Sequence, residues 1–73
     1  MTLGESPLQQ AERHVRQAEA TIARQERIIA ELEQDGHREQ AELARQLLQT
    51  MQSVLMVARE HADFERGSAE RNT

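Results

Sequence analysis

Two long stretches of the chain repeat apolar residues at alternating spacings of three and four, the pattern of an a/d seam along an α-helix. The first predicts a helix over residues 6–34 with the seam Leu8, Ala11, Val15, Ala18, Ile22, Gln25, Ile29 and Leu32. The second predicts a helix over residues 38–66 with the seam Ala41, Ala44, Leu48, Met51, Leu55, Ala58 and Ala62. Residues 1–5 and 67–73 are expected to be tails of this single domain.

Local signals mark the ends of both helices. Ser6, Pro7 and Gln9 match a capping box with proline at the first helical position, where its missing N–H costs nothing. Residues 35–37, Asp-Gly-His, predict a turn, because glycine readily adopts the left-handed conformation that ends a helix. Gly67 is expected to end the second helix in the same way. A glycine inside a helix costs only about 1 kcal/mol, so one continuous helix is the alternative to a hairpin.

A turn at residues 35–37 would bring the two seams together in an antiparallel pair. Large residues then meet small ones, which favours close packing. These pairs are Ile29 with Ala44, Leu32 with Ala41, Ala18 with Leu55, and Val15 with Ala58, while Ile22 meets Met51. Gln25 against Leu48 is a weak layer, where the amide lies at the rim or sets the register. The expected fold class is all-α, an antiparallel, coiled-coil-like hairpin of two helices.

The positions that flank the seams test this pairing independently. The first helix carries the acidic column Glu12, Glu19, Glu26 and Glu33, and the second carries the mostly basic column Arg45, Gln52, Arg59 and Arg66. These columns lie side by side in an antiparallel pair, so opposite charges favour that orientation. Each exposed ion pair contributes only about 0–1 kcal/mol, so the columns add specificity more than stability.

The second helix carries another set of apolar residues beside its seam. These residues are Leu43, Leu47, Val54, Val57 and Phe64, and Ile28 lies on the matching rim of the first helix. A lone hairpin would leave them bare, and a large apolar strip on a small protein marks an interaction surface. The simplest completion is a second copy, giving a dimeric four-helix bundle of either orientation. Another protein as the partner stays an open alternative.

Composition narrows the function classes. The 73 residues include one aromatic residue and no cysteine, and the net charge is −4. Disulfides and thiolate metal sites are therefore impossible, and a reducing cytoplasm is the expected compartment. The cations are all arginines interspersed with acids, without the basic stripe and stacking aromatics of nucleic-acid binders. The longest apolar run spans residues 54–58, far below the roughly 20 residues of a membrane span, and we expect no signal peptide and no membrane partner.

Candidate chemistry is sparse. His14 and His61 fall on the same rim of the expected hairpin, where they are candidates for a metal site or a pH-sensitive contact. The alternative is that both are partly solvated residues at the open end. No Glu-x-x-His motif of a di-iron bundle occurs, and Ser53 has no general base at helical spacing. We expect no enzymatic activity and no cofactor.

Part of the sequence resembles a known family. The matching residues are His14, Val15, 22–25 (IARQ), 28–33 (IIAELE), 35–37 (DGH), Leu47, Leu48 and Thr50, with His61 resembling a later histidine. They resemble short helical proteins of α-proteobacteria, of the rhizobial type. The family often has Asp-Thr after the turn, where this chain has Arg38-Glu39. The resemblance implies a small bacterial cytoplasmic protein and carries no established activity.

These observations predict a non-enzymatic interaction or self-association module. Two alternatives remain at this point. One is a metal or ligand sensor that uses His14 and His61. The other is a small regulator that docks its apolar strip on a larger signalling protein.

Overall fold

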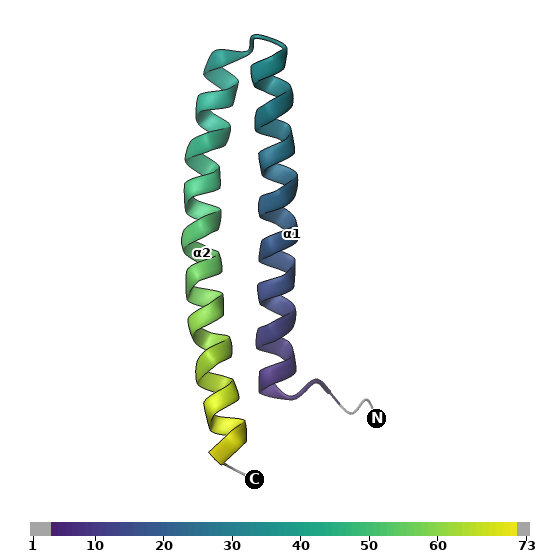
Figure 1. Ribbon diagram of the computed structural model, residues 1–73, viewed down its shortest axis with the longest axis vertical. Coiled ribbons are helices and arrows are strands. Elements are labelled where there is room, and N and C mark those ends of the chain that lie inside the picture. The colour runs from purple at the N-terminus through teal and green to yellow at the C-terminus, as the bar shows by residue number, and fades with distance from the viewer. Residues whose placement is uncertain (1–3, 72–73) are drawn as a thin grey trace.

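The computed structural model describes residues 4–71, which form two antiparallel helices joined by a tight turn (Figure 1). Helix α1 spans Pro7–Gln34 and helix α2 spans Arg38–Arg71. The hairpin measures 54 × 26 × 13 Å. The all-helical fold with two packed helices is confirmed, and no strand occurs in the described range. The alternative prediction of one continuous helix is wrong, because the chain reverses direction at the turn. The tail predictions for residues 1–3 and 72–73 lie outside the described residues.

The start of α1 has the predicted capping box. The backbone N–H of Gln9 donates to the Ser6 hydroxyl at 3.1 Å, and the Ser6 N–H donates to Gln9 Oε1 at 2.9 Å. Pro7 occupies the first helical position. These two bonds satisfy donors that a helix start otherwise leaves unpaired, which is worth about 1 kcal/mol.

The turn after α1 depends on Gly36. Its φ of 78° lies in the left-handed region. Glycine adopts this conformation without strain because it has no Cβ, whereas other residues are strained there. The His37 N–H donates to the Leu32 carbonyl at 2.9 Å, and the Gly36 N–H donates to the Glu33 carbonyl at 3.1 Å. This pair of bonds is a Schellman motif, which closes the last turn of α1 and directs the chain into α2.

Helix α2 does not end at Arg66 as predicted. It continues through Gly67 to Arg71, so residues 67–71 are helical rather than a tail. Gly67 does not adopt the positive φ that a glycine cap requires. Ser68 and Ala69 line a groove together with Pro7 and Leu8, so the added turn lies beside the start of α1. A glycine inside a helix costs only about 1 kcal/mol, so Gly67 does not by itself end α2.

The core lies along the two predicted seams, and every seam position is buried or half-buried. The buried members are Ala11, Ile22, Gln25, Ile29, Ala41 and Ala62. Three of these six are alanines, so the interior between the helices is narrow. The hairpin therefore hides one stripe of each helix and leaves the other faces in solvent.

Candidate interaction surface

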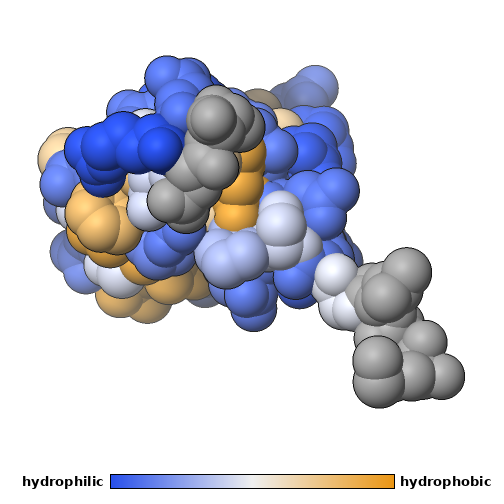
Figure 2. Space-filling view, turned by 90° about the horizontal axis from the view of Figure 1, so that it is seen from below, coloured by the Kyte–Doolittle hydropathy of each residue, from blue (hydrophilic) through white to orange (hydrophobic). Residues whose placement is uncertain are grey.

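One face of α2 exposes a row of large apolar side chains. Leu43, Leu47, Val54, Val57 and Phe64 are between 49% and 65% exposed. Seen from the open end of the hairpin, hydrophobic surface gathers on the α2 side of the molecule (Figure 2). Ile28 of α1 is 40% exposed. All six residues of the predicted interface are thus accessible, and their role in binding stays a prediction.

These residues form a second heptad seam, which we call the outer seam. It comprises Leu43, Leu47, Thr50, Val54, Val57, His61 and Phe64. Most of its members immediately precede a residue of the seam that packs on α1, as Leu47 precedes Leu48 and Val54 precedes Leu55. One residue step is about 100° around a helix of 3.6 residues per turn. Helix α2 therefore has two apolar faces roughly at right angles, and α1 covers only one.

The outer seam borders the rim of α1. Thr21 of α1 lines a shallow groove with Val54 and Thr50, and Ala18 and Met51 form the rest of its wall. Of the residues that line this groove, only Ala18 and Met51 belong to the two seams that pack α1 against α2. The groove shows that the exposed face reaches from α2 across to the edge of α1.

The opposite rim is held by ion pairs. Glu19 lies 3.2 Å from Arg59, Glu12 lies 3.5 Å from Arg66, and Glu33 pairs with Arg45. Each heptad step forward along α1 is matched by a heptad step back along α2, as the predicted columns require. The Arg45 pKa is raised, chiefly by its hydrogen bond to Glu33. The acidic and basic columns are confirmed as neighbours at these three layers.

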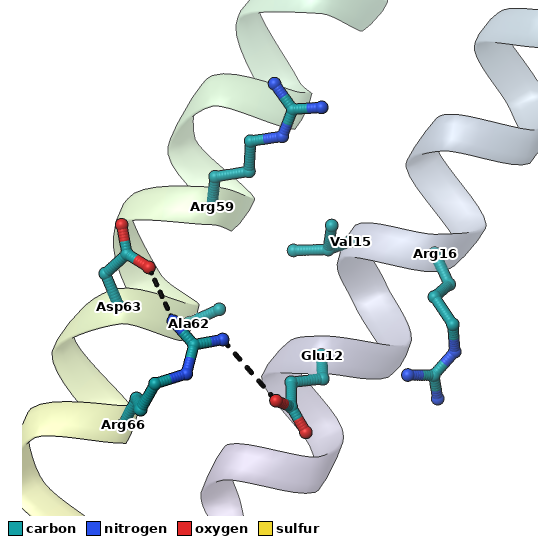
Figure 3. Close-up of a pocket in the computed structure, with 7 residues that line it drawn as sticks. All are labelled: Glu12, Val15, Arg16, Arg59, Ala62, Asp63 and Arg66. Carbon is teal, nitrogen blue, oxygen red and sulfur yellow. Dashed lines mark hydrogen bonds and ion pairs between the residues drawn. The ribbon is translucent and has the colours of Figure 1, made fainter.

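A groove on this rim collects several arginines (Figure 3). Arg66 bridges Glu12 at 3.5 Å and Asp63 at 2.9 Å. Arg59 lines the same groove and pairs with Glu19. Carboxylates hold the Arg59 and Arg66 guanidinium groups, so the ion pairs in this groove join the two helices, while Arg16 also lines the groove.

The two histidine candidates lie on the surface. His14 and His61 are exposed, and His61 Nε2 lies 3.9 Å from the Glu65 carboxylate. This contact was missed by the sequence reasoning, although a spacing of four residues on one helix signals it. Within residues 4–71, no three or more His, Cys, Asp or Glu side chains are grouped to hold a metal ion. The sensor interpretation stays a prediction.

A second ion pair was also missed. Arg13 Nε donates to both carboxylate oxygens of Glu5 at 2.9 Å. The bond lowers the Glu5 pKa and raises the Arg13 pKa. A spacing of eight residues across a helix start has no regular signature, so the sequence offered little signal for it.

The fold and surface together define a helical hairpin with one unpartnered apolar face. No protein-family model, curated protein or solved structure matches the chain. The resemblance to short α-proteobacterial helical proteins therefore stays a prediction. Neither helix of the described chain has a stretch that is apolar enough to cross a bilayer.

Proposed function

We propose that this chain is a non-enzymatic self-association module. Two copies pair through the outer seam, with Ile28 at its edge, into a dimeric bundle of four helices. The observation that carries the proposal is the row of exposed leucine, valine and phenylalanine side chains along one face of α2. Burial of apolar surface contributes about 25 cal/mol per Å² removed from water, and such strips mark interaction sites.

The narrow core supports the same conclusion. A domain below roughly 70–80 residues rarely gains enough from its own core, and oligomerisation is one common remedy. Here the buried residues are mainly alanine and isoleucine, and the chain has no disulfide as an alternative staple. A chain without cysteine suits a reducing cytosol, and we propose that compartment for it.

The test is the solution mass, measured by light scattering over a dilution series. With no Trp or Tyr, the protein is nearly invisible at 280 nm, so refractive index must report its concentration. The expected mass is twice the 8.4 kDa of one chain, held down to micromolar concentration. A mass of one chain would overturn self-association and leave the outer seam available to another protein.

Substitutions locate the association face. Replacement of Leu47 and Val54 by glutamate is expected to give the monomer mass, because the charges would be buried without partners. Met56→Glu is the matched control, since Met56 is 61% exposed but lies off the outer seam. Circular dichroism of both variants reports helicity. If the double variant unfolds, the milder Val57→Gln tests the same face by weakened association at retained helicity. A dimer unaffected by either change would contradict the assignment.

A further inference from the structure

The outer seam contains two polar positions, and their places limit how a second copy can bind. Thr50 and His61 interrupt an otherwise apolar row. Two helices that pack through heptad seams in opposite directions place each a residue against a d residue of the partner. For a two-fold pair of α2 helices, only a few registers satisfy this rule. Each register gives a different set of facing residues.

One antiparallel register matches like with like from Leu47 to Phe64, and it leaves Leu43 opposite Ser68 of the second copy. It pairs Leu47 with Phe64, Val54 with Val57, and Thr50 with His61 of the second copy, and each pair occurs twice by symmetry. The two-fold axis passes between Leu55 and Met56. The threonine hydroxyl then faces an imidazole, and both can donate and accept hydrogen bonds.

Neighbouring registers lose this match. A slide of one copy by a heptad sets His61 against Leu43 or against Val57 of the other. Either pairing sets the imidazole against an aliphatic side chain that offers it no hydrogen bond, which is less favourable than a threonine hydroxyl. A parallel pair would place His61 on His61 and Phe64 on Phe64, so the bulkiest and the titratable residues would each oppose themselves.

We propose that two copies of this chain associate chiefly through α2, antiparallel, with Leu47 of each copy against Phe64 of the other. This inference rests on the proposed self-association and specifies its geometry. Helix α1 stays on the outside, because its corresponding second face alternates His14, Thr21 and Ile28 with the polar positions Gln17, Arg24 and Glu31. At the level of Leu47, Ile28 adds an apolar edge beside the incoming phenyl ring.

The charges beside the seam are compatible with this arrangement. The flank away from α1 carries Gln46, Ser53 and Glu60 along the seam. In the matched register, Glu60 lies nearest to Ser53 and Gln46 of the second copy. The two Glu60 residues are about 13 Å apart along the axis at 1.5 Å per residue. That separation exceeds the screening length of about 8 Å at physiological salt. No like charges therefore face each other along this flank.

Disulfide trapping tests the register directly, because the protein has no cysteine of its own. In the L47C/F64C variant the two thiols of one chain are about 25 Å apart along α2, too far to join within a chain. Oxidation with diamide is expected to give at least ten-fold more covalent dimer than L47C or F64C alone. The S53C/E60C pair keeps every apolar residue of the seam, and it is expected to cross-link above its own single variants.

Each other result overturns the register. Cross-linking of L47C alone as efficient as that of the double variant would show a parallel pair. Stronger cross-linking of L47C/V57C would show the antiparallel register shifted by a heptad. No cross-linking in any variant, with a dimer mass by light scattering, would place the contact on another face. A monomer mass for the wild-type chain would instead remove the proposed self-association itself.

Discussion

The side-chain amide of Gln25 in α1 donates a hydrogen bond to the backbone carbonyl of Ala44 in α2, at 2.9 Å. Gln25 is only 7% exposed and lies in the middle of an otherwise apolar seam. Within residues 4–71 no buried side-chain nitrogen or oxygen lacks a partner, so this amide is satisfied. A seam of small apolar residues can slide, whereas one polar contact fixes the two helices at a single height. Gln25 therefore ties α1 to α2 at the level of Ala44.

Substitutions at Gln25 separate its volume from its hydrogen bond. Gln25→Ala is expected to lower the free energy of unfolding by about 1–3 kcal/mol, because it removes both the contact and the packed stem. Gln25→Leu fills the seam, and the Ala44 carbonyl keeps its bond within the helix, so stability is expected to stay equal or rise. Urea unfolding followed by circular dichroism at fixed protein concentration measures both changes. An equal loss of unfolding free energy in both variants would mean that the hydrogen bond, and not the packed volume, accounts for the contribution of Gln25.

The ion-pair rim has one incomplete layer. Gln52 occupies the position across from Glu26, between the pairs of Arg59 and Arg45. Gln52→Arg should complete the column and raise the free energy of unfolding by up to about 1 kcal/mol at low salt. Near 1 M salt the gain should disappear, since the screening length there is about 3 Å. Gln49→Arg adds the same charge at an exposed position outside the column. An equal gain from this control would show that the effect is one of net charge alone.

Alanine is expected to have opposite effects on stability at Gly36, in the turn, and at Gly67, inside α2. A Cβ added at Gly67 or at Gly36 meets nothing within 4 Å, so crowding does not distinguish them. Gly67 lies in regular helix, and Gly67→Ala should raise stability by about 1 kcal/mol. Gly36 has a φ of 78°, and Gly36→Ala should lower stability by about 1–2 kcal/mol. Thermal unfolding followed by circular dichroism checks both signs. Destabilisation by Gly67→Ala would contradict the helical end of α2.

The two faces of α2 were readable from the sequence because helical periodicity directly encodes which side chains share a face. The seam positions are buried or half-buried and the second apolar set is exposed, as the spacing indicates. The partner of Gln25 was not predictable, since a backbone acceptor leaves no mark in the sequence. The prediction at Gly67 was wrong because glycine ends a helix in this way only where its φ is positive, and the residue type does not reveal the φ.

The ion pair that precedes α1 predicts a pH response. The hydrogen bond from Arg13 lowers the pKa of the Glu5 carboxyl from its ordinary value near 4.5. A carboxyl whose pKa is lower in the folded state stabilises the fold above its unfolded pKa, and this contribution is lost as the pH falls through the folded value. The Glu5–Arg13 contribution should therefore be constant from pH 7 to about pH 5 and decline below about pH 4. A ¹³C NMR titration of the side-chain carboxyls should give Glu5 a midpoint below the ordinary value near 4.5. Arg13→Gln should return the Glu5 midpoint toward the ordinary value. A Glu5 midpoint unchanged by that substitution would show that the bond to Arg13 is absent in solution.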